Sequence, residues 1–139
     1  TKQLELNELL KQYLQDYEEV YDYRNIEVTI DEQDIFNVTM NESLAVALLT
    51  NLLKNAFVHN IDGGHIRITV TKNSITFRNS GVENPLDKEH IFERFYQGTK
   101  KEGSTGLGLA IADSICRLQH LSIRYYFEQK EHCFEISRQ

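Results

Sequence analysis

The first part of the chain repeats apolar residues at steps of three and four. These positions are Leu6, Leu9, Leu10, Tyr13, Leu14, Tyr17, Val20 and Tyr21. Because this is the period of one face of an α-helix, it predicts that about the first 20 residues are helical. Two later stretches, 26–30 and 36–40, alternate polar and apolar side chains and are rich in β-branched residues. They predict two strands.

The most apolar run of the chain predicts a second helix. Asn41 stands where an N-cap would, and the following run, rich in Leu and Ala, holds neither Gly nor Pro. We expect this helix to end near His59 or Asn60, before the turn residues at 62–64.

Alternation returns in the second half of the chain. Strands are expected at 65–70 and 74–79, joined as a hairpin, and at 122–127 and 133–137. A third helix is expected from Gly106, with one face made of Leu107, Ala110, Ile111, Ile115 and Leu118. These elements predict an α+β fold, a two-layer sandwich with three main helices on one face of a mixed, mostly antiparallel sheet.

Length, charge and cysteine content narrow the class of protein. The 139 residues suit one domain over 1–139, and no apolar stretch approaches the length of a membrane helix. The net charge of −6 argues against binding to nucleic acid, which needs a basic face. The two cysteines, Cys116 and Cys133, lie in a helical and a strand pattern, and we expect packing roles for both in a reducing compartment.

A glycine-rich stretch, GSTGLGLAI at 103–111, raises the question of phosphate binding. A Walker loop is excluded because Leu109 and Ala110 follow where Lys and Ser or Thr are needed. A Rossmann motif is excluded because the third glycine and the preceding strand are missing. What remains is a simple turn, or a loop that leads into a helix N-terminus able to receive anionic oxygens.

Asn51, Asn55 and His59 follow one another at four-residue steps in the second helix, so they share a face. Two amides in so apolar a helix are unfavourable unless they are paired or functional. Neutral oxygen donors suit Mg²⁺, whereas the alternative is a pair of core amides bonded to neighbouring backbone.

Together these segments resemble the GHKL ATPases and, within them, the sensor histidine kinases. NLLKNAFVHN (51–60) resembles the N box of the family, FRNSG (77–81) its first glycine box, IFERF (91–95) its F box and GSTGLGLAI its second glycine box. The resemblance runs from about Leu6 to the end of the chain. It implies a Bergerat-type ATP-binding fold with a mobile ATP lid at about 80–105.

The resemblance also implies roles for the residues of the first two boxes. Asn55 would hold the Mg²⁺ that bridges the ATP phosphates, with Asn51 lining the same cavity and His59 near the nucleotide. Relatives that hydrolyse ATP carry a glutamate at the position of Asn51, so its absence favours transfer to another acceptor. Asn79 stands where the family has an adenine-binding aspartate, and Gly81 keeps the first glycine of that box.

In the second glycine box, the resemblance implies that backbone N–H groups of Thr105, Gly106, Leu107 and Gly108 hold the β- and γ-phosphates. The basic residues usual in the family are replaced by Val58 and Gln97, the second glycine of the first box by Glu83, and a further glycine by Ser104. Arg94, Lys100 and Lys101 would compensate as phosphate contacts from the lid. Phe92 and Phe95 would anchor the lid.

The implied function is phosphoryl transfer from Mg-ATP in two-component signalling. None of the five histidines has the context of a phosphoacceptor, so the acceptor is expected on a separate dimerisation domain of a parent kinase, with a response regulator as an indirect partner. The resemblance places the domain in the cytoplasm without direct membrane contact. The alternatives are a serine kinase like the anti-sigma factors and a nucleotide-binding module that has lost catalysis.

Overall fold

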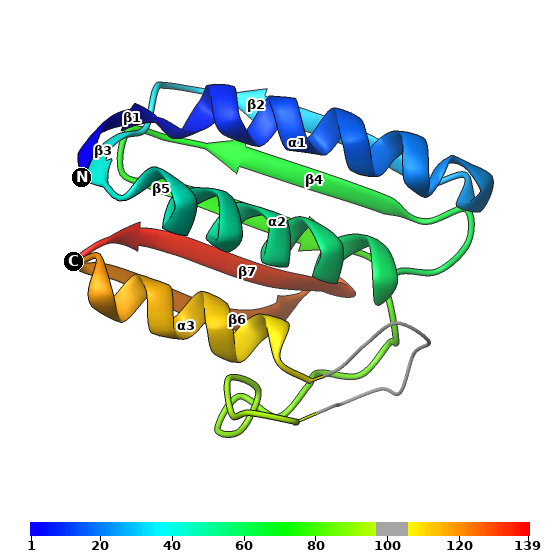
Figure 1. Cartoon of the computed structure of the whole chain (residues 1–139). Coiled ribbons are helices and arrows are strands. Elements are labelled where there is room, and N and C mark those ends of the chain that lie inside the picture. Colours follow the sequence, from blue (N-terminus) through cyan, green and yellow to red (C-terminus); the bar gives the residue numbers. More distant parts are fainter. Residues whose placement is uncertain (97–105) are drawn as a thin grey trace.

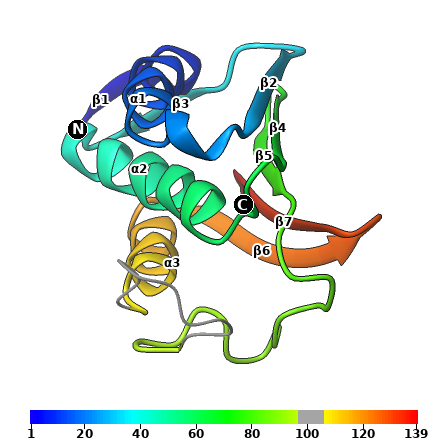
Figure 2. The same ribbon diagram turned by 90° about the vertical axis from the view of Figure 1, so that its right-hand side faces the viewer.

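Three helices cover one face of a five-stranded sheet in the computed structural model, which describes residues 1–96 and 106–139 (Figure 1). The helices are α1 (Leu6–Val20), α2 (Glu42–Val58) and α3 (Gly108–Leu118), and a 3-10 helix, η1 (Asp22–Arg24), follows α1. The strands are β1 (Lys2–Glu5), β2 (Glu27–Glu32), β3 (Asn37–Met40), β4 (His65–Val70), β5 (Ser74–Asn79), β6 (Leu121–Glu128) and β7 (Glu131–Arg138). Figure 2 shows all three helices on the same side of the sheet.

The main sheet has the strand order β2-β4-β5-β7-β6. Its first pair, β2 and β4, is parallel, and the other neighbouring pairs are antiparallel. A mixed, mostly antiparallel sheet under a layer of helices is the architecture predicted from the sequence, and the expected hairpin of β4 and β5 is present. The predicted α+β fold is confirmed.

The start of the chain differs from the prediction in one detail. Residues Lys2–Glu5 form a strand rather than the beginning of a helix, and this strand pairs with β3 as a separate two-stranded sheet. Strands β2 and β3 are therefore both present but do not pair with each other. The reason is that β2 reaches across to β4, a pairing between segments distant in sequence that leaves no local pattern.

Helix α2 lies at the centre of the helical layer and supplies much of the core. Its cap is as predicted, because Asn41 Oδ1 accepts a hydrogen bond from the N–H of Leu44 at 3.0 Å. Its buried side chains are Ala45, Leu48, Leu49, Leu52, Leu53, Ala56 and Phe57. They pack against strand residues on the covered side of the sheet, including Ile66, Ile68, Phe77, Phe134 and Ile136.

Helix α3 begins at Gly108, two residues later than expected, and it buries Ala110 and Ile115 as predicted but not the whole predicted face. Ile111 and Leu118, predicted to be on the core side, are 42% and 67% exposed. Ala112 and Cys116 are buried instead. The prediction was wrong for Ile111 and Leu118 because apolar residues lie on almost every side of this short helix, so its period does not select one face.

The C-terminal end of α2 is held by Arg24, which directly follows α1 and belongs to η1. Its guanidinium donates hydrogen bonds to the carbonyls of Phe57 and Asn60, and its Nε donates to Asp62 at 2.8 Å. A cation at a helix C-terminus satisfies carbonyls that have no partner within the helix. Among the residues described, no helix has the length and apolarity needed to cross a membrane.

Candidate nucleotide-binding site

Asn51, the first residue of the predicted polar stripe, lies against the start of α3. Asn51 and Asn55 on α2 and His59, its C-cap, are all half-buried. Asn51 Nδ2 donates to the carbonyl of Ala47 at 2.7 Å, and its Oδ1 lies 3.0 Å from the place where a Cβ on Gly108 would be. The first turn of α3 therefore packs on the amide of Asn51, and a side chain at 108 would press against that amide. The structure brings together the N box and the second glycine box.

Gly106 fixes the chain on the approach to α3. It has φ +75°, and a Cβ there would lie 2.7 Å from Cα of Phe95. Its carbonyl accepts a hydrogen bond from the N–H of Phe95 at 2.6 Å. Only glycine meets both the left-handed backbone and the close approach. Phe95, the last residue of the F box, and Gly106, within the second glycine box, are thus joined directly.

Helix α3 has no side-chain cap at its N-terminus among the described residues. The half-buried residue before the helix is Leu107, whose apolar side chain cannot cap it. The first-turn N–H groups of a helix have no intrahelical partner and carry partial positive charge, which suits phosphate oxygens. Thr105, Lys100 and Lys101, which were also expected at the phosphates, lie outside the described residues, as do Ser104 and Gln97.

Asn79 ends β5 on the covered side of the sheet and is 1% exposed. Its Nδ2 donates to the carbonyl of Ser80 at 2.8 Å, which fixes the orientation of the amide. Its Oδ1 is buried and has no hydrogen-bond partner among the described residues. An unsatisfied buried acceptor costs about 1–3 kcal/mol, so this oxygen is suited to receive a donor from a ligand.

Gly81 connects Asn79 to the end of α2. It is buried, and a Cβ there would lie 2.8 Å from the carbonyl oxygen of His59 and 3.1 Å from the ring of His132. The predicted residues of the first glycine box and the last residue of the N-box stripe therefore lie side by side. Any side chain at 81 would force this junction apart.

A hydrogen-bond network beneath this junction was not found from the sequence. Asn60 is fully buried; its Nδ2 donates to the carbonyls of Ala56 and His65, and its Oδ1 accepts from Ser80 Oγ at 2.6 Å. Ser80 Oγ in turn accepts from the N–H of His65 at 2.9 Å. Gly64 has no room for a side chain, since a Cβ would lie 2.3 Å from both Asn60 Oδ1 and Ser80 Oγ. The signal was present, because Asn60 and Ser80 are the polar residues next to His59 and Asn79.

A second network joins the sheet to the segment after Asn79, and it too was missed. His132 on β7 is 4% exposed; its Nε2 bonds the carbonyl of Val82 at 2.7 Å, and its Nδ1 pairs with the hydroxyl of Tyr125 on β6 at 2.8 Å. That hydroxyl also accepts the N–H of Leu86 at 2.9 Å. Burial lowers the pKa of His132 and raises the pKa of Tyr125.

The F box is anchored by one of the two predicted residues and by a neighbour that was not predicted. Phe92 is half-buried and packs edge-on against Phe134, with 6.3 Å between ring centroids, as expected. Phe95 is 66% exposed and its side chain is not an anchor, contrary to the prediction. Ile91, 1% exposed, takes that role. The exposed Arg94 lies over the Phe95 ring at 5.7 Å.

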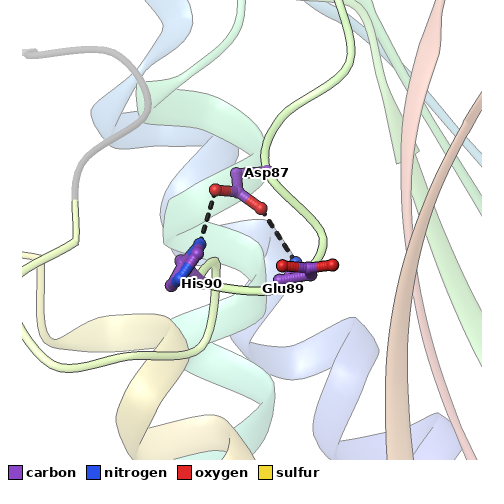
Figure 3. A group of neighbouring side chains, drawn as sticks. All are labelled: Asp87, Glu89 and His90. Atoms are coloured by element: carbon purple, nitrogen blue, oxygen red, sulfur yellow. Dashed lines mark hydrogen bonds and ion pairs between the residues drawn. The ribbon is translucent and has the colours of Figure 1, made fainter.

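Three side chains of the 87–90 turn, Asp87, Glu89 and His90, are close enough to share an ion (Figure 3). All three are exposed, and Asp87 already accepts hydrogen bonds from the N–H of Glu89 at 3.0 Å and from His90 Nδ1 at 2.6 Å. The bond between the two side chains lowers the pKa of Asp87 and raises the pKa of His90. Asp87 thus stabilises a turn through these hydrogen bonds, and the group is separate from the asparagines on α2 that were predicted to bind the metal.

The chain belongs to the family of histidine kinase-, DNA gyrase B- and HSP90-like ATPases, whose pattern matches residues 40–137. Similar proteins narrow the class. The heme sensor protein HssS of Staphylococcus aureus is 33% identical over 127 residues, which are 88% of this chain and 28% of HssS. The chain therefore spans just over a quarter of the length of that relative.

Solved structures give the same answer. The catalytic domain of the histidine kinase ThkA is 26% identical and superimposes with a TM-score of 0.85 over 97% of this chain and 92% of that one. The mycobacterial sensor histidine kinase MprB shares the fold, with a TM-score of 0.84 at 18% identity over 99% of this chain and 97% of that chain. The chain is an ATP-binding domain of the sensor histidine kinase type, as its motifs predicted.

Proposed function

We propose that this domain binds Mg-ATP and donates the γ-phosphate to a histidine on a separate dimerisation and phosphoacceptor domain of its parent kinase. The observation that carries the proposal is the buried Oδ1 of Asn79, which has no partner among the described residues. The remaining support comes from the family and from the contacts between α2, α3 and the first glycine box.

Asn79 would read the base. The exocyclic amino group of adenine is a donor and satisfies Oδ1, whereas the 6-oxo group of guanine would place an acceptor against an acceptor. Because Nδ2 is bonded to the carbonyl of Ser80, the amide cannot turn over to suit guanine without breaking that bond. The asparagine therefore serves in place of the aspartate usual in the family, with the same preference for adenine.

The phosphates would lie at the N-terminus of α3. Gly106 and Gly108 keep the backbone there free of side chains, and the half-buried amide of Asn51 touches the first turn. Backbone N–H groups and the helix dipole supply fixed positive potential where phosphoryl transfer develops negative charge. We include residues 80–105 as a lid that closes over the nucleotide, with Ile91 and Phe92 as its anchor on the sheet.

Asn55 would hold the metal. It lies one helical turn beyond Asn51 on the same edge of α2, and an amide oxygen with phosphate oxygens and waters is a suitable donor set for Mg²⁺. When bound, Mg²⁺ neutralises phosphate charge. Asn51 has no carboxylate with which to activate water, so the chain favours transfer to a protein acceptor, which needs positioning rather than a base on this domain.

The partners follow from this reaction. The γ-phosphate must be transferred to the phosphoacceptor domain of the parent kinase and, through it, to a response regulator. The structure of the ThkA kinase in complex with the response regulator TrrA has been solved. We place the domain on the cytoplasmic side, where ATP and response regulators are available. The similar proteins found are sensor kinases, which favours a histidine acceptor over the serine of anti-sigma-like kinases.

The test is transfer in trans. The chain is mixed with the phosphoacceptor domain of its parent kinase, Mg²⁺ and ATP labelled on the γ-phosphate, and acid-labile label on the acceptor is measured. We expect transfer by the wild type and by the control Asn37→Ala, an exposed residue on β3, and loss of more than about 90% by Asn55→Ala. ATP binding without transfer by the wild type would instead support a module that has lost catalysis.

A further inference from the structure

The hydrogen-bond chain through His132 has only one arrangement of protons that satisfies every atom. The carbonyl of Val82 can only accept, so Nε2 of His132 carries a proton and donates to it. In a neutral ring Nδ1 is then an acceptor, and the Tyr125 hydroxyl donates to it. The lone pairs of that hydroxyl remain free to accept the N–H of Leu86. The arrangement therefore requires neutral histidine.

These hydrogen bonds fix two points of the segment that follows Asn79, the residue proposed to bind the base. Val82 and Leu86 are bound at the two ends of the pair, four residues apart, and the ring of His132 also lies under Gly81. On the sheet, His132 stands directly opposite Asn79 in the register of β5 and β7. Tyr125 and His132 therefore connect the segment after β5 to strands β6 and β7.

In the part of the chain that the structure describes, the groups in contact with His132 carry no charge that would stabilise a protonated ring. Tyr125 and Phe127 of β6 lie against it, with ring centroids 5.9 and 4.8 Å away. From β5 it faces the uncharged Asn79, and from the segment 81–82 it meets backbone and glycine.

The titratable residues next to His132 on β7 point to the other face of the sheet. Glu131 is bound there to Arg67 and His65, and Cys133 lies on the same face as Glu131. Glu83, beside Val82, is exposed, and its carboxylate lies 4.0 Å from the ammonium of Lys130. Within the described residues, no hydrogen bond joins His132 to a carboxylate.

We propose that Tyr125 and His132 are positioning residues for the base-binding side of the nucleotide site, and that protonation of His132 releases residues 82–86 and weakens ATP binding. A proton on Nδ1 would set two donors, N–H and O–H, against each other. The hydroxyl would have to turn its proton away from Nδ1, so the hydrogen bond that it donates there would be lost, and the reoriented oxygen would hold the N–H of Leu86 less well. This inference rests on the proposed function, because it concerns the same site.

The first measurement needs no nucleotide. Amide hydrogen exchange of the chain is followed for Leu86 and its neighbours in the wild type, in Tyr125→Phe and in the control Tyr126→Phe. Tyr126 is the next residue on β6 and lies on the opposite face of the sheet. We expect Leu86 to exchange at least about tenfold faster in Tyr125→Phe, because its acceptor is gone, and unchanged exchange in the control. Equal exchange in all three proteins would overturn the inference.

The second measurement is Mg-ATP affinity between pH 8 and pH 5. Tyr125→Phe is expected to weaken binding about threefold to tenfold at pH 8, because the hydroxyl that bonds both Leu86 and His132 is removed. His132→Gln keeps an N–H for Val82 but cannot gain a proton, so its affinity should stay within about twofold of the wild type at pH 8. The ratio of wild-type to His132→Gln affinity should fall as the pH drops, and the titration of the nucleotide itself cancels in that ratio.

The two proposals fail in different ways. If the wild type binds ATP and Asn79→Ala does not, while Tyr125→Phe behaves as the wild type, the positioning role is wrong and the proposed function stands. If the wild type does not bind ATP at all, the proposed function fails, whereas hydrogen exchange still reports on the anchor. A pH-independent ratio would contradict the protonation step. Nitrogen-15 spectra of His132 should show the Nε2–H tautomer at neutral pH.

Discussion

Arg24 is predicted to be the most important single polar residue for the stability of the α2 end of the site. Its side chain is 13% exposed and donates to the carbonyls of Phe57 and Asn60, on either side of His59. Each hydrogen bond from a charged group contributes about 1.5 kcal/mol, and the pair with the exposed Asp62 adds little. Arg24→Met should therefore lower the free energy of unfolding by about 3 kcal/mol, or Tm by about 10 °C.

The assay is urea and thermal unfolding followed by circular dichroism, with Arg117→Met as the matched control. Arg117 lies on α3 and is 78% exposed. Among the described residues its ion pair is with Asp113 four residues away, an interaction of about 0.3–0.5 kcal/mol. If Arg24→Met cost no more than Arg117→Met, the idea that Arg24 holds the end of α2 would be refuted.

Three further predictions concern other parts of the structure. Burial raises the pKa of Cys116 to about 12 and of Cys133 to about 11, so neither thiol should react with a thiol reagent at pH 7.5 unless the chain is unfolded; labelling of the native protein would contradict this. Gly106→Ala should destabilise the domain by about 1–3 kcal/mol in urea unfolding, because of its positive φ and the contact with the Phe95 backbone, whereas Gly63→Ala, with positive φ but open space, should cost less. Arg67 and His65 lower the pKa of Glu131, so its stabilising effect is present above pH 4.5 and is lost as the pH falls through its folded-state pKa; Glu131→Gln should flatten that acid limb of the stability profile.

Much of the site could be predicted because its signals are local. Asn51 and Asn55 stand out as amides in an apolar helix, and Gly106 and Gly108 as glycines before a helix. The structure explains both glycines by close approach to Phe95 and Asn51. Such residues can be recognised in the sequence because another side chain at the same position would clash or leave a buried polar group unpaired.

The rest depends on contacts between distant segments. Nothing near His132 in the sequence marks it, since its partners Tyr125, Val82 and Leu86 are brought together by the sheet order. The parallel pairing of β2 with β4 is of the same kind. Strand β1 was missed because four residues directly before an amphipathic helix are too few to show alternation against its stronger period.

The adenine preference assigned to Asn79 is the central claim, and isothermal titration of Mg-ATP and Mg-GTP into the wild type and Asn79→Ala tests it most directly. The wild type should bind Mg-ATP at least about tenfold more tightly than Mg-GTP, because the buried Oδ1 gains a donor only from adenine. Asn79→Ala should lose most of that preference. Equal affinity of the wild type for both nucleotides, or an unchanged preference in Asn79→Ala, would contradict the account.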